Sequence, residues 1–96
     1  MKINFTAELK TLGGEPLQPP TTLKEVAVNI LLTLLDDERN LPGEEKAKRS
    51  LLATRIYANP ENIDLTVEEL ALIKKLIGKA YTPLIVGQAW QMLEGA

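Results

Sequence analysis

The chain has 96 residues and a mass of 10.6 kDa, and we expect one domain that spans residues 1–96. Apolar residues make up 45% and charged residues 25%, which is typical of a globular chain and not of a disordered one. Eleven basic and thirteen acidic residues give a net charge of −2, so no overall charge excess attracts the chain to nucleic acid or to an anionic membrane.

Cysteine and histidine do not occur in the sequence. Without cysteine the chain has no disulfide, no thiolate nucleophile and no cysteine–zinc site. Without histidine it lacks the commonest general base and the commonest metal ligand. We therefore expect a protein that is not an enzyme and that has no catalytic residues, no metal and no cofactor.

Residues 2–18 predict a β-hairpin. Ile3, Phe5, Ala7 and Leu9 alternate with polar residues, which is the period of a strand with one buried face. The pair of glycines at 13–14 suits a tight turn. The returning strand contains a proline, which cannot donate to a ladder, so this strand is expected at an edge.

Four helices are predicted after the hairpin. Thr22 and Thr66 are each followed three residues later by Glu, the pattern of a capping box at a helix start. Pro83 suits the first position of the last helix. The second helix is expected to stop at Asn59-Pro60, because the residue before a proline is disfavoured in the helical conformation. The predicted helices cover about residues 23–36, 44–58, 67–80 and 83–94.

The first of these helices is predicted to be central. Its apolar residues sweep about 240° of its circumference, well beyond an ordinary amphipathic stripe. The sequence therefore predicts an α+β fold in which the hairpin is followed by four helices packed around a central apolar first helix. The predicted core comprises Phe5, Ile30, Leu31, Leu34, Ile73, Ile77 and Trp90.

Two residue patterns that could carry chemistry are better explained by structure. Ser50 is the sole serine and has no histidine to activate it, so we interpret it as a helix-surface residue. Asp36, Glu38 and Asn40 have the alternate spacing of a calcium loop, but Leu41 stands where such a loop needs glycine. A solvated loop between helices is the favoured interpretation.

Nucleic-acid binding is the alternative function. Residues 66–94 also fit a helix-turn-helix with Gly78 in the turn, but the second helix of that unit offers only Gln88 and Gln91 as base readers. Basic residues that follow acidic ones along a helix are also explained without nucleic acid, because this order favours the helix dipole and allows i,i+4 ion pairs. The alternative is a small DNA-binding regulator that uses Lys46, Lys48, Arg49, Arg55, Lys74, Lys75 and Lys79.

The last helix carries the favoured interaction surface, formed by Leu84, Gln88, Gln91 and Glu94. A solvated stripe more often carries Lys and Glu, whereas neutral amides tolerate burial against another chain. The exposed hairpin edge could pair with a symmetry mate. We therefore predict a homo-oligomer, with a twofold dimer as its simplest form. The alternative is that both glutamines face water and the hairpin folds back on its own helices.

Residues 72–90, together with 2–5 and 13–17, resemble small proteins encoded by tailed phages and prophages. The resemblance implies a bacterial cytoplasm or a virion, and work in virion assembly or host control. These proteins share no settled function, so no functional residues are carried over. The most apolar stretch, residues 26–35, is too short for a bilayer, which needs about 20 residues. The expected function is therefore a non-enzymatic protein–protein interaction module that binds a protein partner, a second copy, or both.

Overall fold

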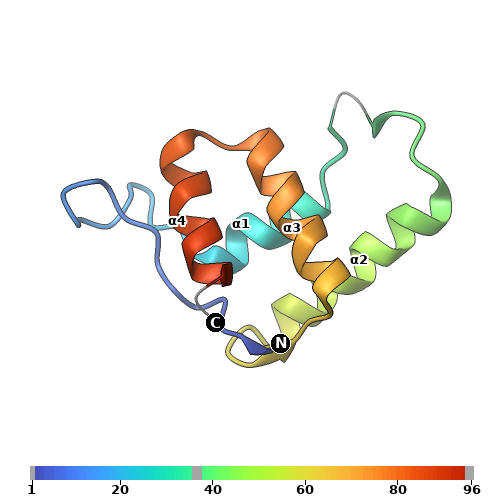
Figure 1. Ribbon diagram of the computed structural model, residues 1–96, viewed down its shortest axis with the longest axis horizontal. Helices are drawn as coiled ribbons and strands as arrows, with labels where there is room; N and C mark the ends of the chain where they lie inside the picture. Colours follow the sequence, from blue (N-terminus) through green and yellow to red (C-terminus); the bar gives the residue numbers. More distant parts are fainter. Residues whose placement is uncertain (1, 36–37, 95–96) are drawn as a thin grey trace.

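The computed structural model describes residues 2–35 and 38–94, and over these ranges it has the predicted α+β fold, with four helices and a two-stranded antiparallel sheet (Figure 1). Three predicted helix ranges are close to those observed, while the first helix is shorter. The elements are β1 (Lys2–Ile3), α1 (Leu23–Leu31), α2 (Gly43–Ala58), β2 (Ile63–Asp64), α3 (Val67–Ala80) and α4 (Pro83–Glu94).

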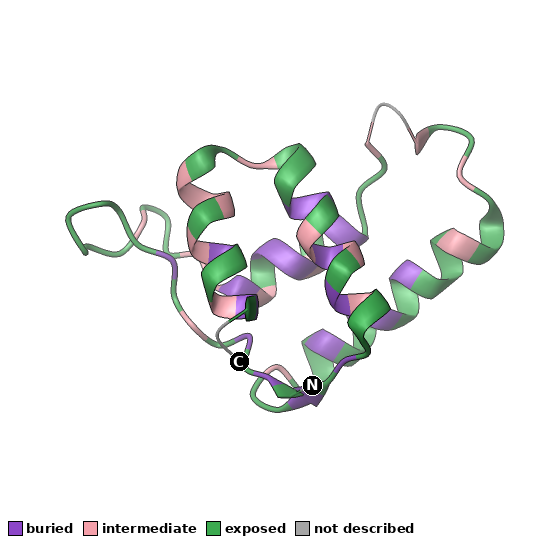
Figure 2. Cartoon of the chain, in the orientation of Figure 1, coloured by how far each residue is buried: buried purple, intermediate pink, exposed green. Residues whose placement is uncertain are grey.

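The N-terminal segment has the buried face that its alternating pattern predicts. Ile3, Phe5 and Leu9 are buried, whereas the polar residues between them are exposed (Figure 2). The pairing partner differs from the prediction, because β1 pairs with β2 and not with residues 15–18. The Phe5 amide donates to the carbonyl of Pro60 at 2.6 Å, so the segment lies against the turn that precedes β2.

The predicted hairpin is present, but it is short. An antiparallel bridge joins Lys10 to Pro16, and the Thr11 amide donates to the Glu15 carbonyl at 2.8 Å. Gly14 has φ +87°, a conformation that a side chain would strain, which explains the glycine in this turn. The hairpin extends away from the helices (Figure 1), and Leu12 at its tip is 96% exposed.

Helix α1 begins where the sequence predicts and packs against two other helices. The Thr22 hydroxyl accepts the Glu25 amide, which caps the first turn. The apolar face of α1 is buried against α2 and α3, whereas α4 packs mainly against α3. Helices α2 and α3 thus both pack on α1.

Helix α1 ends at Leu31, although the sequence predicts a helix to residue 36. The last turn tightens there, because the Thr33 amide donates to the Ile30 carbonyl three residues earlier at 3.4 Å and the Thr33 hydroxyl donates to the Asn29 carbonyl. Acidic residues follow at 36–38, and the negative end of a helix disfavours them. Leu34 is consequently 48% exposed, so the prediction that it belongs to the core is wrong.

Trp90 is the second error in the predicted core, because its side chain is 37% exposed. The indole lies on Gly78 of α3, where an added Cβ would come within 3.2 Å of Trp90 Cζ2. Helix α3 extends to Ala80, so Gly78 lies inside the helix and not in the turn of a helix-turn-helix, as the alternative prediction had it. The other predicted core residues are confirmed as buried: Phe5, Ile30, Leu31, Ile73 and Ile77.

Candidate functional site

The predicted surface on α4 is partly used inside the molecule. The Gln88 side-chain amide donates to the Lys10 carbonyl at 2.5 Å, and its oxygen accepts the Lys10 amide at 2.8 Å. Gln88 thus pairs with the backbone at the base of the hairpin, while the tip of the hairpin extends away from the helices. Glu94 forms an ion pair with Lys74, Leu84 is half-buried, and Gln91 is exposed.

Arg49, which was predicted as a candidate nucleic-acid contact, is buried in an ion pair with Glu38. Two nearly parallel hydrogen bonds join Arg49 Nη1 to Glu38 Oε1 at 2.9 Å and Nη2 to Oε2 at 2.6 Å. Glu38 also accepts the Leu35 amide, so the pair holds the segment after α1 against α2. With 6% of its surface exposed, Arg49 cannot reach a nucleic acid from this position.

This ion pair also sets the ionisation of Glu38. Hydrogen bonds from the Arg49 guanidinium lower the pKa of Glu38 from 4.5 to about 2, although burial acts in the opposite direction. The carboxylate is therefore fully ionised near neutral pH. Its role is structural, because both of its oxygens are held by α2.

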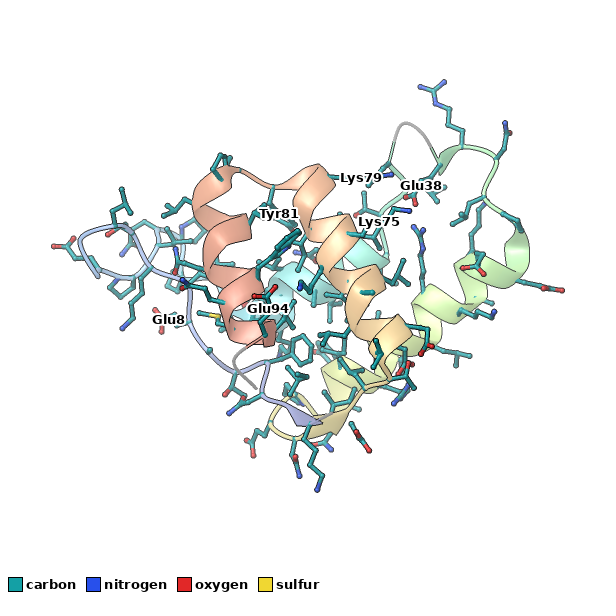
Figure 3. All side chains as sticks on the ribbon, viewed as in Figure 1. Glu8, Glu38, Lys75, Lys79, Tyr81 and Glu94 are labelled. Carbon is teal, nitrogen blue, oxygen red and sulfur yellow. The ribbon has the colours of Figure 1, made fainter. Side chains whose placement is uncertain are left out.

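Three of the remaining basic residues of the alternative nucleic-acid surface form ion pairs: Lys48, Arg55 and Lys74. Arg55 bonds to Glu69 at 2.7 Å and to the Asp64 carbonyl, and Lys48 lies 3.7 Å from Glu45. These pairs connect α2 to its neighbours or to itself. Lys46, Lys75 and Lys79 are exposed, Lys74 is half-buried, and Lys75 and Lys79 lie on the side of α3 that faces the segment around Glu38 (Figure 3).

The acidic segment around Glu38 does not form the calcium loop that its spacing suggests. Glu38 of the possible calcium loop is engaged by Arg49, and Asp36 lies outside the described residues. In residues 2–35 and 38–94, no group of three or more acidic side chains is placed to hold a metal ion. In the same ranges, each helix is too short or too polar to cross a membrane.

The early end of α1 creates an apolar recess at the start of α2, which we call the leucine recess. It has a volume of about 290 Å³. Among its lining residues, Leu32 is 61% exposed and Leu34 is 48% exposed. The leucine recess is lined by Leu31, Leu32, Thr33, Leu34, Leu41, Lys46, Arg49 and Ser50.

A second apolar hollow, the α2–α3 groove, lies on the other side of α2. It has a volume of about 530 Å³ between α2 and α3. Leu51, Leu52 and Leu72 supply its apolar lining, and Leu51 is 66% exposed. Charged residues of both signs form its rim: Glu45, Lys48, Arg55, Glu68 and Glu69.

The outer stripe of α2 lies between these two hollows. Ala47, Leu51 and Thr54 are exposed and spaced i, i+4, i+7, so they share one side of the helix. Together, the outer stripe, the leucine recess and the α2–α3 groove form a surface that we call the docking face. The sequence analysis missed it, although uncharged residues at 47, 51, 54 and 58 of a charged helix were a usable signal.

No protein family, curated protein or solved structure matches the chain. The function is therefore inferred from the docking face and from the ion pairs of the chain itself.

Proposed function

We propose that the chain is a non-enzymatic protein–protein interaction module that binds its partner through the docking face. The observation that carries the proposal is the exposure of Leu51 on α2 and of Leu32 and Leu34 in the recess beside that helix. Burying a leucine side chain is worth about 1.5–3 kcal/mol, so a cluster of exposed leucines favours association. Exposed apolar clusters with polar rims are typical of protein interaction sites.

The ionisation of Glu38 supports a non-enzymatic role. A general acid or base works best when its pKa lies near the working pH. The pKa of Glu38, about 2, is far from that range because Arg49 stabilises the carboxylate. The group is thus used to hold the chain and is poorly suited to proton transfer.

The distribution of charge favours a protein over a nucleic acid as the partner. Arg49 and Arg55 are engaged by glutamates, and the rim of the α2–α3 groove carries acids next to bases. A phosphate backbone selects a surface of one sign, because each contact neutralises a phosphate. A rim of mixed charge suits another protein surface. The DNA-binding regulator is therefore the less favoured proposal.

The biological setting that we propose is the one that the resemblance to proteins of tailed phages and prophages implies. We place the module in a bacterial cytoplasm or a virion, acting in virion assembly or host control.

Photo-cross-linking in bacterial cells tests this proposal. A benzophenone amino acid replaces Leu51 in one variant and Val67 in the control variant. Val67 is 67% exposed, close to the value for Leu51, but it begins α3 and does not line the docking face. We expect light-dependent adducts from position 51 and none from position 67.

A second variant tests whether the adduct from position 51 depends on the leucine recess. Replacing Leu32→Ser and Leu34→Ser together removes the apolar surface of the leucine recess and should abolish the adduct from position 51. Equal adducts at the two positions, or none at position 51, would contradict the proposal.

A further inference from the structure

A third hollow, which we call the tryptophan recess, lies between α3 and α4. It has a volume of about 600 Å³, within the range of about 300–1,000 Å³ that is usual for small-molecule sites. Among the described residues, it shares no lining side chain with the leucine recess or the α2–α3 groove, so it is separate from the docking face. The tryptophan recess is lined by Ala71, Lys74, Lys75, Gly78, Val86 and Trp90.

We infer that the tryptophan recess binds a small planar aromatic molecule that carries an anionic group. The Trp90 indole supplies a surface on which an aromatic ring stacks, and the Lys75 ammonium group supplies a partner for the anion. A nucleoside monophosphate and an aromatic carboxylate both have this chemistry. The inference goes beyond the proposed interaction function and does not depend on the docking face.

Three contacts hold the Trp90 indole in one orientation. Its Nε1 donates to the Lys74 carbonyl at 3.1 Å, which fixes one edge of the ring on the backbone of α3. Gly78 permits this approach, because a Cβ at that position would lie 3.2 Å from Trp90 Cζ2. The Lys74 ammonium group lies 4.9 Å from the centre of the ring, in a cation–π contact. Part of an immobilised ring thus remains accessible, and stacking on it costs little further side-chain entropy.

The charges around the tryptophan recess leave one ammonium group for a ligand. Lys74 is engaged by Glu94, and these two charges compensate each other. Lys75 is exposed and has no ion pair within residues 2–35 and 38–94. The flexible four-carbon chain of a lysine lets its ammonium group turn toward a ligand. One uncompensated cation beside an aromatic wall therefore favours a ligand that combines a ring with a negative group.

The apolar part of the lining excludes simpler ligands. Ala71 and Val86 extend the apolar surface of the indole. An anion without a ring would leave this surface exposed, whereas a ring without a charge would leave Lys75 unused. A nucleic-acid strand is less well matched, because a single uncompensated lysine does not follow a series of phosphates.

Titration of the full chain with AMP and with benzoate tests the inference, from about 10 µM to 10 mM, the range that suits a weak, open site. Trp90 is the sole tryptophan, so its indole N–H gives one resonance in a proton–nitrogen correlation spectrum. We expect AMP or benzoate to shift this resonance saturably, with a Kd of about 0.1–1 mM, and the tighter ligand identifies the anionic group. Adenosine lacks the anion and inorganic phosphate lacks the ring, so each should bind about fivefold more weakly than AMP.

Two pairs of variants locate the ligand in the tryptophan recess. Lys75→Gln should weaken AMP binding about fivefold and leave adenosine binding unchanged, whereas Lys46→Gln, at an exposed lysine of α2, should change neither. Gly78→Ala should displace the indole and weaken AMP binding several-fold. Gly87→Ala is its control, because a Cβ at that position meets nothing within 4 Å. Both alanines favour the helix to a similar extent, and melting temperatures show whether the fold is kept.

Four results would overturn the inference. They are no saturable shift of the indole resonance with either ligand, unchanged AMP affinity in Lys75→Gln, unchanged AMP affinity in Gly78→Ala, and adenosine or phosphate binding as tight as that of AMP. Tighter binding of an oligothymidine than of AMP would also overturn it, in favour of the DNA-binding regulator. Adducts from position 51 are measured independently, so failure of this inference leaves the docking face standing.

Discussion

At the scale of single residues, the Glu38–Arg49 pair has the largest effect on how this surface is built. It holds the segment after α1 against α2, and that segment carries Leu34 and Leu41 into the leucine recess. A charge buried in this way depends on its partner, because an uncompensated buried charge is costly. The pair therefore couples the shape of the docking face to the ionisation of one carboxylate.

The lowered pKa of Glu38 predicts a pH dependence of stability. A group whose pKa falls from 4.5 to about 2 on folding stabilises the native state above its unfolded pKa. That contribution, up to about 3 kcal/mol, is lost as the pH decreases from about 5 to 2. Urea unfolding of the wild type and Glu38→Gln should show a difference at pH 7 that disappears near pH 2.

Glu61→Gln is the control for this measurement, because Glu61 is an exposed acid in the turn before β2. Its difference from the wild type should be small and independent of pH. A Glu38→Gln difference that stays constant from pH 7 to pH 2 would mean that the ion pair does not set the ionisation of Glu38.

Gln88 predicts a local effect that can be separated from global stability. Gln88→Ala removes both hydrogen bonds to Lys10, and each is worth about 1 kcal/mol or less. We expect faster hydrogen exchange at the amide of Lys10 and in the hairpin, with a modest change in melting temperature. Gln91→Ala, an exposed residue on the same helix, should leave exchange in the hairpin unchanged. Equal exchange in the two variants would show that Gln88 does not hold the hairpin.

At the scale of elements, the early end of α1 gives different burial to two leucines, Leu31 and Leu34, that are both predicted to lie in the core. Leu31 is buried, so Leu31→Ala should cost about 2–5 kcal/mol. Leu34 is half exposed, so Leu34→Ala should cost less than about 1 kcal/mol. Chemical denaturation at low protein concentration measures both costs without a contribution from association. Similar costs would mean that Leu34 is as buried as Leu31 in solution.

The sequence predicts most of the helix boundaries because local signals mark them. The Thr66 hydroxyl and the Glu69 side chain form the full capping box, and α4 begins at Pro83. The end of α1 is missed because the apolar pattern continues to Leu35, whereas the helix ends at Leu31. An apolar pattern gives the face of a helix but does not give its length.

Long-range pairs could not be predicted from the sequence. The Glu38–Arg49 pair and the β1–β2 pairing depend on how the chain folds between their members. Each strand contributes only two residues, which is too few to show a period. The docking face combines α1, α2 and α3, and its hollows exist only after these helices have packed. In sequence terms, only the uncharged positions of α2 point to it.

At the scale of the whole molecule, paired and dispersed charges predict weak binding to nucleic acid. Proteins that make 6–10 phosphate contacts lose about 10³–10⁵ in affinity between 50 and 200 mM salt. We expect this chain to elute from heparin at low salt and to show a shallow dependence of DNA affinity on salt. A steep dependence, with tight binding at low salt, would favour the DNA-binding regulator over the interaction module.

The pairing of β1 with β2 has a consequence for how the chain is made. Ile3 and Phe5 are synthesised well before their backbone partners, which lie at residues 60–63. The N-terminal segment must therefore wait until two helices and β2 have been synthesised before it can take its place. During translation, Ile3 and Phe5 therefore have no backbone partner until β2 has been made, and the part of the core that they fill closes only after that.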